Sequence, residues 1–398
     1  MDETETVEVE RRRRRRWPLV LGAVLLVLLL ALLIAWLLRF SIAADFIDRE
    51  LARRGVQASY EVKRIGFRRQ RLENLVIGDP RAPDLTARWV EVELSWGGFR
   101  QPKVALITAR GVRMRGRIVD GRVSLGQVDR LLPPPSGLPF RLPDQRIDVA
   151  DAAIRLETPA GPIGIGLEGR GNLSSGFRGH MAAVGRSLRF RECLVTAPRA
   201  AVAVSVDRLR PTFRGPLLID RVQCEDDFAL ARPRFDLDVT LAQAFNSWTG
   251  RSRVEAAGMQ AGPHRLAALQ ANVTVDGNIR DMRGEIDLAS GPAAVASFRA
   301  AASRVAGTYA LSPRHGDVAV NGDIALRGLT LAGPFRPVAA AMRSADGTPV
   351  GPIGRRLADA LTRFSEGGAD ARARLHVVNR DGGGNVQFAD LDVAARSG

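Results

Sequence analysis

Apolar and polar side chains alternate along most of the chain after residue 55. The run at 235–241 is the clearest, because Phe, Leu, Val and Leu stand at its odd positions with Asp, Asp and Thr between them. A period of two places the apolar side chains of a strand on one face and the polar side chains on the other. The pattern therefore predicts a mainly β protein of many short antiparallel strands, each with one apolar and one polar face.

Two segments have helical spacing instead. Within 39–54, the residues Ile42, Phe46 and Leu51 recur on one side of a helix, which predicts a short amphipathic helix. A second helix is predicted at 349–366, between Thr348-Pro349 and Gly367-Gly368. Its apolar positions are Ile353, Leu357, Leu361 and Phe364.

The apolar strand faces must be covered, either by a second sheet or by closure of the sheet into a barrel. A third solution is an elongated, repetitive sheet that curls into an apolar groove and holds another molecule. Aromatic residues make up only 6% of the chain, and many inward candidates are Ala, Val or Gly, so a lining of this kind leaves space and favours the groove. The alternative for each candidate is the ordinary core of a sandwich. The candidate lining residues are Val202, Val204, Val206, Phe235, Leu237, Val239, Leu241, Leu269, Val273 and Val275.

A long uncharged segment near the N-terminus, 17–38, predicts a transmembrane helix. A helix of this length extends roughly 33 Å, enough to cross a bilayer core of about 30 Å. Trp17 and Trp36 stand near its two ends, where indole rings favour the membrane interface. The arginines before it place the N-terminus in the cytoplasm and the rest of the chain on the far side of the membrane. They are Arg11, Arg12, Arg13, Arg14, Arg15 and Arg16.

A cleaved signal peptide is the alternative reading of this segment, because Ser41-Ile42-Ala43 offers small residues to a signal peptidase. The apolar run is longer than the roughly 7–15 residues of a signal peptide, which favours an uncleaved anchor. The chain is then divided into a cytoplasmic stub (1–16), the transmembrane helix (17–38), the amphipathic helix (39–54), a β module (55–130), a Pro-rich linker (131–144) and a repetitive β region (145–398) that contains the helical insert. Residues 395–398 resemble an unfinished strand, so we expect a C-terminal truncation.

The chain is strongly basic, with a formal net charge of +15, and almost all of its basic residues are arginines. Lys63 and Lys103 are the only lysines, which is typical of a GC-rich genome and accounts for much of the charge. The functional alternative is an arginine-rich surface that meets anionic lipid head groups or a cell-envelope polymer. We expect no nucleic-acid partner, because the predicted topology is unsuitable and reader motifs are lacking.

Two cysteines, Cys193 and Cys224, fall in strand-like runs of the extracytoplasmic part, where disulfides persist. They predict either a disulfide or two buried thiols that pack as small apolar residues. Two cysteines without a nearby histidine cannot form a zinc site, and we expect no metal.

The sequence contains no convincing catalytic or cofactor motif. The segment 164–169 matches GxGxxG, but no helical pattern follows its glycines, so it lacks the helix N-terminus that binds a pyrophosphate. The four histidines are scattered without metal or triad spacing, and the alternation places Asp236 and Asp238 on the solvated face of one strand. We therefore expect neither an enzyme nor a cofactor.

The layout of nearly the whole chain resembles the N-terminal region of bacterial AsmA-like proteins, and within that clan the YdbH and TamB branches. The motifs that carry the resemblance are LENLVIGDP at 72–80, LTAR at 85–88 and VSLGQVDRLLP at 123–133, behind a single predicted span. The resemblance implies a protein anchored in the inner membrane that bridges the periplasm. It also implies that phospholipid acyl chains travel along the groove between inner and outer membranes, and it offers no catalytic residues.

Two other functions stay open at this point. TamB-like relatives suggest an assembly or secretion partner of outer-membrane β-barrel proteins, which would give the chain an outer-membrane protein as a partner. The second is a passive scaffold that maintains the spacing of the envelope. The sequence does not reveal the direction of transport, the lipid species or the energy source.

Overall fold

The computed structural model describes residues 48–49, 51–66, 68–95, 103–119, 122–131, 141–225, 228–295, 298–312, 317–331, 340–344, 351–380 and 383–395. The predicted stub, the span at 17–38 and most of the Pro-rich linker lie outside these residues. Among the residues that are described, no helix is long and apolar enough to cross a membrane.

The described strands form one long sheet of 25 strands, which confirms the mainly β prediction. In its first part, β7 pairs in parallel with both β4 and β5, whereas neighbours such as β2 with β3 and β7 with β8 are antiparallel. The elements of this part are β1 (Ala58–Ile65), β2 (Arg69–Ile77), β3 (Leu85–Ser95), β4 (Lys103–Arg110), β5 (Arg113–Val119), β6 (Arg122–Ser124), the 3-10 helix η1 (Gly126–Leu131) and β7 (Arg146–Thr158).

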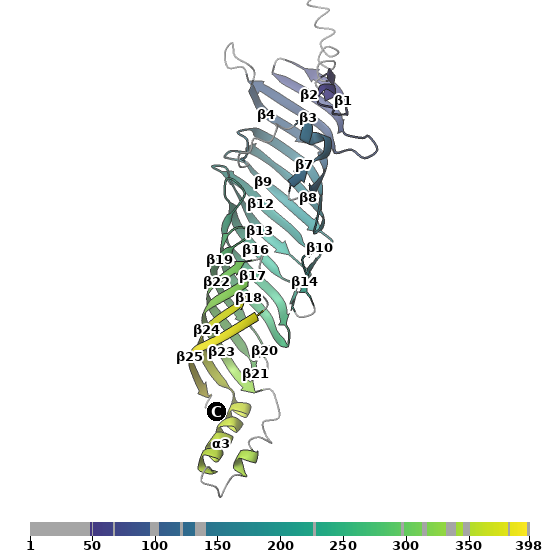
Figure 1. Ribbon diagram of the computed structural model, residues 1–398. Helices are drawn as coiled ribbons and strands as arrows, with labels where there is room; N and C mark the ends of the chain where they lie inside the picture. The colour runs from purple at the N-terminus through teal and green to yellow at the C-terminus, as the bar shows by residue number, and fades with distance from the viewer. Residues whose placement is uncertain are drawn as a thin grey trace, which may run out of the picture.

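From β8 onward, successive antiparallel strands build the main body of the sheet, here called the broad wall. It consists of β8 (Gly161–Asn172), β9 (Arg178–Gly185), β12 (Arg199–Asp207), β13 (Arg210–Leu218), β16 (Arg234–Leu241), residues 248–256 of β17 (Trp248–Ala261), 269–277 of β18 (His264–Gly277), β19 (Met282–Ser290), β22 (Ala302–Ser312), 317–327 of β23 (Asp317–Leu331), β24 (Ala369–Arg380) and β25 (Gly383–Ala395). These strands cross the long axis of the molecule obliquely and follow one another along its length (Figure 1).

A second row of short strand segments, here called the narrow wall, continues the same hairpins beyond the broad wall. It consists of β10 (Ser187–Phe190), β11 (Cys193–Thr196), β14 (Arg221–Cys224), β15 (Phe228–Ala231), β20 (Ala293–Val295) and β21 (Phe298–Ala300), with residues 258–261 of β17, 264–267 of β18 and 329–331 of β23. The labels of β10, β14, β20 and β21 follow one long edge of the sheet (Figure 1).

A line of backbone irregularities, here called the crease, separates the two walls. Ala197, Arg232 and Ala268 have φ of 49°, 48° and 50°, and each lies where its strand passes from one wall to the other. In β23 the same place is taken by Gly328, at φ 61°, where the pairing with β24 shifts register. Bulges of this kind bend a strand and increase its twist. Because they recur at the same level of neighbouring strands, the sheet folds along a line and acquires two walls.

The backbone at the crease keeps its hydrogen bonds despite the bend. The N–H of Asp220 donates to the carbonyl of Thr196, and the N–H of Arg232 donates to the carbonyl of Asp220, at 3.0 and 2.9 Å. Pro233, which follows Arg232, has no N–H to donate and is fully buried. The crease is therefore a satisfied feature of the sheet, since buried backbone groups left without partners would be costly.

The N-terminal end of the sheet is closed by a small apolar cluster of Val56, Ile77 and Val128, all buried. η1 brings Val128 to this cluster, and the N–H of Gln127 donates to the Asp84 carboxylate at 2.9 Å. Gly126 permits this contact, because a Cβ at that position would lie 2.4 Å from the same carboxylate. The LGQVD sequence therefore forms a cap over the end of β2 and β3.

Two predicted helical segments fall within or partly within the described residues. The predicted 39–54 helix is described only in part, and residues 48–49 and 51–53 are helical. The predicted helical insert is confirmed as α3 (Gly351–Gly367), which begins two residues later and ends one residue later than expected. A short helical turn at 340–343 was not predicted. α3 lies at the end of the sheet opposite β1 (Figure 1).

Candidate apolar groove

The predicted lining residues lie on a single face of the broad wall. Val204 pairs with Phe213, which pairs in turn with Val239 on the next strand. The same row continues from Val239 through Gly250 to Val275. Cross-strand partners point to the same side of a sheet. The register therefore brings together, on β12, β16 and β18, the residues Val202, Val204, Val206, Phe235, Leu237, Val239, Leu241, Leu269, Val273 and Val275.

The glycines of this face show that it is the concave side of the sheet. A Cβ added to Gly307 would lie 2.1 Å from the Asn321 carbonyl oxygen, and one added to Gly322 would lie 2.2 Å from that of Ala306. On the opposite face, a Cβ on Gly164 or Gly166 would meet nothing closer than 3.3 Å. The backbone of neighbouring strands thus closes in on the apolar side. Glycine kinks and bulges are the usual means by which a sheet is curved.

Burial on the concave face is uneven. Val202, Val204 and Val206 are buried, because Phe177 and partly buried side chains from the adjacent turns pack over them. Phe235 to Leu241 on β16 are only half-buried, and Val386 and Phe388 on β25 are more than half exposed. A packed core buries such side chains almost completely. The concave face is therefore covered closely at β12, partly at β16 and little at β25.

Several polar groups on the concave face are hydrogen-bonded, whereas the buried Asn379 Oδ1, opposite Val318, has no partner among the described residues. The Tyr309 hydroxyl donates to the Thr274 carbonyl oxygen at 2.8 Å, and burial raises the pKa of this phenol. The hydroxyls of Ser290 and Ser303 lie 2.6 Å apart across β19 and β22. Since the Tyr309, Ser290 and Ser303 hydroxyls already form hydrogen bonds, they add little polarity to the concave face.

The convex face of the broad wall carries the charges, and most of them form ion pairs. Asp238 accepts from Arg214 at 3.0 Å and from Arg251 at 3.4 Å, and Asp287 is paired with Arg304 at 2.7 Å. The hydrogen bond from Arg304 lowers the pKa of Asp287. Asp236 pairs with Arg234 in the same way, at 2.9 Å. These aspartates are therefore solvated, neutralised groups, as the alternation predicted.

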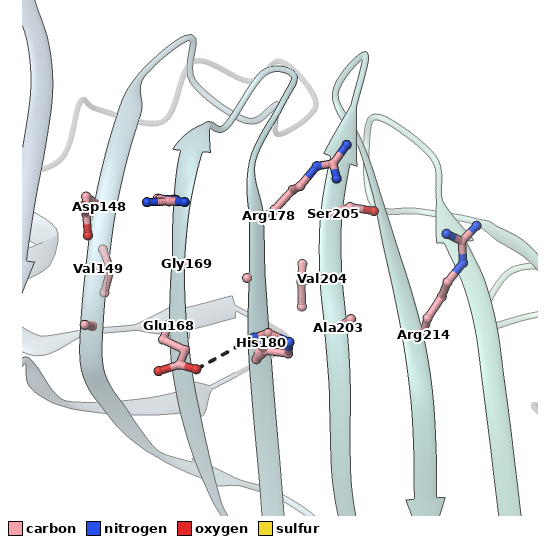
Figure 2. A pocket seen from close by; sticks show the side chains of 13 residues that line it. Asp148, Val149, Glu168, Gly169, Arg178, His180, Ala203, Val204, Ser205 and Arg214 are labelled. Carbon is pink, nitrogen blue, oxygen red and sulfur yellow. Dashed lines mark ion pairs between the residues drawn. The ribbon is translucent and has the colours of Figure 1, made fainter.

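One hollow of the convex face contains a histidine and a carboxylate, but it is poorly suited to chemistry. It has a volume of about 620 Å³, and His180 Nδ1 lies 3.7 Å from Glu168 Oε1 on the neighbouring strand. Figure 2 shows both side chains projecting from adjacent strands, with Arg178 and Arg214 farther along the hollow. No third group orients the pair, and both side chains are largely exposed. Among the described residues, no group of three or more His, Cys, Asp or Glu could hold a metal ion.

Comparison with known families gives a match over nearly the whole chain. A family model described as YdbH-like, intermembrane phospholipid transport protein YdbH, matches residues 26–397. The chain belongs to the YdbH-like family. The sequence-based resemblance to the YdbH branch of the AsmA-like clan is thereby confirmed. No curated protein and no solved structure matches the chain.

This YdbH-like chain contains one disulfide, between Cys193 and Cys224, with an S–S distance of 2.03 Å. The two residues are direct cross-strand partners on β11 and β14. They lie on the same side of the narrow wall as Val195 and Val222, which is the concave side. The bond therefore ties together two strands of only four residues each, at a place where few neighbouring strands support them.

The sequence reasoning placed the glycines at 164–169 in a strand, and they lie in β8. It missed the narrow wall and the crease. A usable signal was present, because Pro198 and Pro233 follow the crease residues Ala197 and Arg232, and Pro292 lies between β19 and β20. Proline inside a strand pattern marks an edge or a bulge. The predicted membrane residues Arg11 to Arg16, Trp17 and Trp36 lie outside the described part of the chain.

Proposed function

We propose that this YdbH-like chain conducts phospholipids between two membranes, with the acyl chains lying along the apolar concave face. The observation that carries the proposal is the continuity of this face, since one cross-strand row runs from Val204 through Phe213, Val239 and Gly250 to Val275. The family description, intermembrane phospholipid transport, supports it. The ten lining residues named above would then act by being apolar and unspecific.

The energetics favour a continuous groove over free diffusion. At about 0.8 kcal/mol per methylene, exposing a 16-carbon chain to water costs on the order of 12 kcal/mol. A groove replaces that exposure with apolar contact along the path. The head group stays in solvent, because the groove is open and its lining offers few free hydrogen-bonding groups.

We further propose that residues 17–38 anchor the chain in the inner membrane, with 1–16 in the cytoplasm and the sheet in the periplasm. The basic block at 11–16 and the uncharged run after it support this orientation. In this arrangement the N-terminal apolar cluster lies near the anchored end of the groove, and β25 with α3 lies toward the outer membrane.

Site-specific photo-crosslinking tests the proposed lipid path. A photoreactive phenylalanine analogue is placed at Leu237, on the concave face of β16, or at the next residue, Asp238, on the convex face. We expect irradiation of intact cells to link labelled phospholipid to position 237 and not to position 238. Equal labelling at the two positions, or none at either, would contradict the proposal. Attachment of a membrane-bound β-barrel protein at 237 instead of lipid would point to a role in assembly.

A further inference from the structure

The convex side of the narrow wall differs in charge from the rest of the molecule. Its described strand segments contain no aspartate or glutamate, whereas they contain the arginines Arg189, Arg221, Arg265 and Arg299. The neighbouring carboxylates lie outside these segments, and the Asp220 carboxylate is paired with Arg199 at 3.2 Å. Genome bias accounts for arginine in general, but it does not account for the absence of acids from one wall only.

Three of these arginines surround a hollow with a floor of small residues. The hollow has a volume of about 690 Å³ and is lined by Arg221, Arg265 and Arg299. Arg265 is the cross-strand partner of Ala294, and Ala294 is the partner of Arg299. Arg221 faces Ala231, and the row continues through Gly258 to Ala267. The floor is therefore mostly alanine and glycine, with Gln260 and Thr330 also in the lining, and the arginines stand among them.

None of the three arginines forms an ion pair with a described residue, although many arginines of the broad wall do. Arg214, Arg251 and Arg304 each have an aspartate within 3.4 Å. The Arg221, Arg265 and Arg299 side chains are exposed, so their guanidinium groups are free to turn toward a ligand. A guanidinium presents a planar fork of N–H donors that fits a phosphate with two parallel hydrogen bonds.

We propose that this hollow binds the phosphate head group of an anionic amphiphile, with the adjoining apolar part of the ligand on the alanine and glycine floor. Pockets of roughly 300–1,000 Å³ with an apolar lining and a few convergent polar groups are typical of small-molecule sites. The hollow opens on the face opposite the groove. The inference therefore does not depend on lipid movement along the concave side.

Charge-matched variants of the full chain test the site. The purified chain in a nonionic detergent is titrated with short-chain phosphatidic acid, with the phosphatidylcholine of the same chain length, and with inorganic phosphate. One variant removes the three cations of the hollow (Arg221→Gln, Arg265→Gln and Arg299→Gln). The control removes three cations from the broad wall (Arg214→Gln, Arg251→Gln and Arg304→Gln). Both variants carry the same net charge, and circular dichroism verifies that each is folded.

We expect the unaltered chain and the broad-wall control to bind phosphatidic acid about tenfold more tightly than phosphatidylcholine, as charge-assisted hydrogen bonds would give. The narrow-wall variant should bind the two lipids within about twofold of each other. A neutral substitution that fills the floor, Ala294→Trp, should reduce the preference while leaving every arginine in place.

Three results would overturn the inference. The first is an unaltered chain that binds both lipids equally. The second is an equal loss of preference in the two charge-matched variants, which would mean that net charge alone attracts the lipid. The third is binding of inorganic phosphate as tight as that of phosphatidic acid, which would leave the apolar floor without a role. None of these results bears on crosslinking at Leu237, so the two proposals stand or fall separately.

Discussion

Apolar side chains are buried at the N-terminal end of the sheet and exposed on β25, at the other end. At the N-terminal end, Val128 is only 8% exposed, because η1 folds over the strands and forms a cluster with Val56 and Ile77. On β25, Val386 is 54% exposed and Phe388 is 58% exposed. At both ends a strand presents an apolar side chain, Ile77 on β2 and Phe388 on β25. Alternation thus determines which face of the sheet is apolar. A separate element that packs on this face determines whether it becomes a dry core or an exposed surface.

A carboxylate introduced at each end of the sheet should show the difference in burial between the two ends most clearly. We expect Val128→Asp to lower the free energy of unfolding by at least about 3 kcal/mol, because an unpaired carboxylate is costly inside an apolar cluster. Val386→Asp, at an exposed position of the open end, should change it by less than about 0.5 kcal/mol. Urea denaturation followed by circular dichroism measures both. Similar losses for the two variants would mean that burial does not distinguish the ends.

The disulfide is expected to compensate for the missing cover on the narrow wall. Replacing both Cys193 and Cys224 by serine should cost about 2 kcal/mol locally, since the bond restrains a chain segment of 31 residues. The effect should be confined to β10, β11, β14 and β15, where amide exchange should accelerate. Exchange at the N-terminal cluster should stay as it was and serves as the internal control. Faster exchange at both places would indicate that the bond supports the whole sheet.

A modest effect on stability, with a large effect on function, is expected on the concave face of β18. Val273 is half-buried on β18, so Val273→Asp should cost only about 1 kcal/mol of stability. A carboxylate in the lipid path should nevertheless reduce phospholipid transfer on the order of tenfold, because acyl chains would have to pass a charged group. The neighbouring Thr274→Asp places the same charge on the convex face and is the control. Transfer between labelled and unlabelled vesicles by the full chain measures both variants, and equal transfer would exclude Val273 from the path.

The period of two was sufficient to predict the strands and the shared face of the ten candidate residues, because side-chain direction in a strand depends only on parity. The helical insert was visible for a similar reason, since Ile353 and Leu357 keep helical spacing. Whether that face is open could not be predicted. Ile77 on β2 and Val386 on β25 both stand in strands, and Ile77 is buried because η1 places Val128 against it.

The narrow wall was missed for a different reason. Strand-like runs were visible at β11 and β14, but four residues are too few to show that they form a separate wall. Pro198 and Pro233 marked the crease at Ala197 and Arg232, whereas the positive φ angle of Ala268 has no local signature. Tertiary curvature imposes this angle. The basic hollow depends on this wall, so it could not have been assembled from the sequence alone.

The crease has a consequence for how such a molecule changes over evolutionary time. Because the bends at Ala197, Arg232, Ala268 and Gly328 lie at the same level, adding or removing a pair of hairpins should change the length of the sheet and leave its cross-section as it is. The number of hairpins then sets the length of the sheet, and the position of the bends sets its width. A sheet built in this way can be lengthened without a change in width.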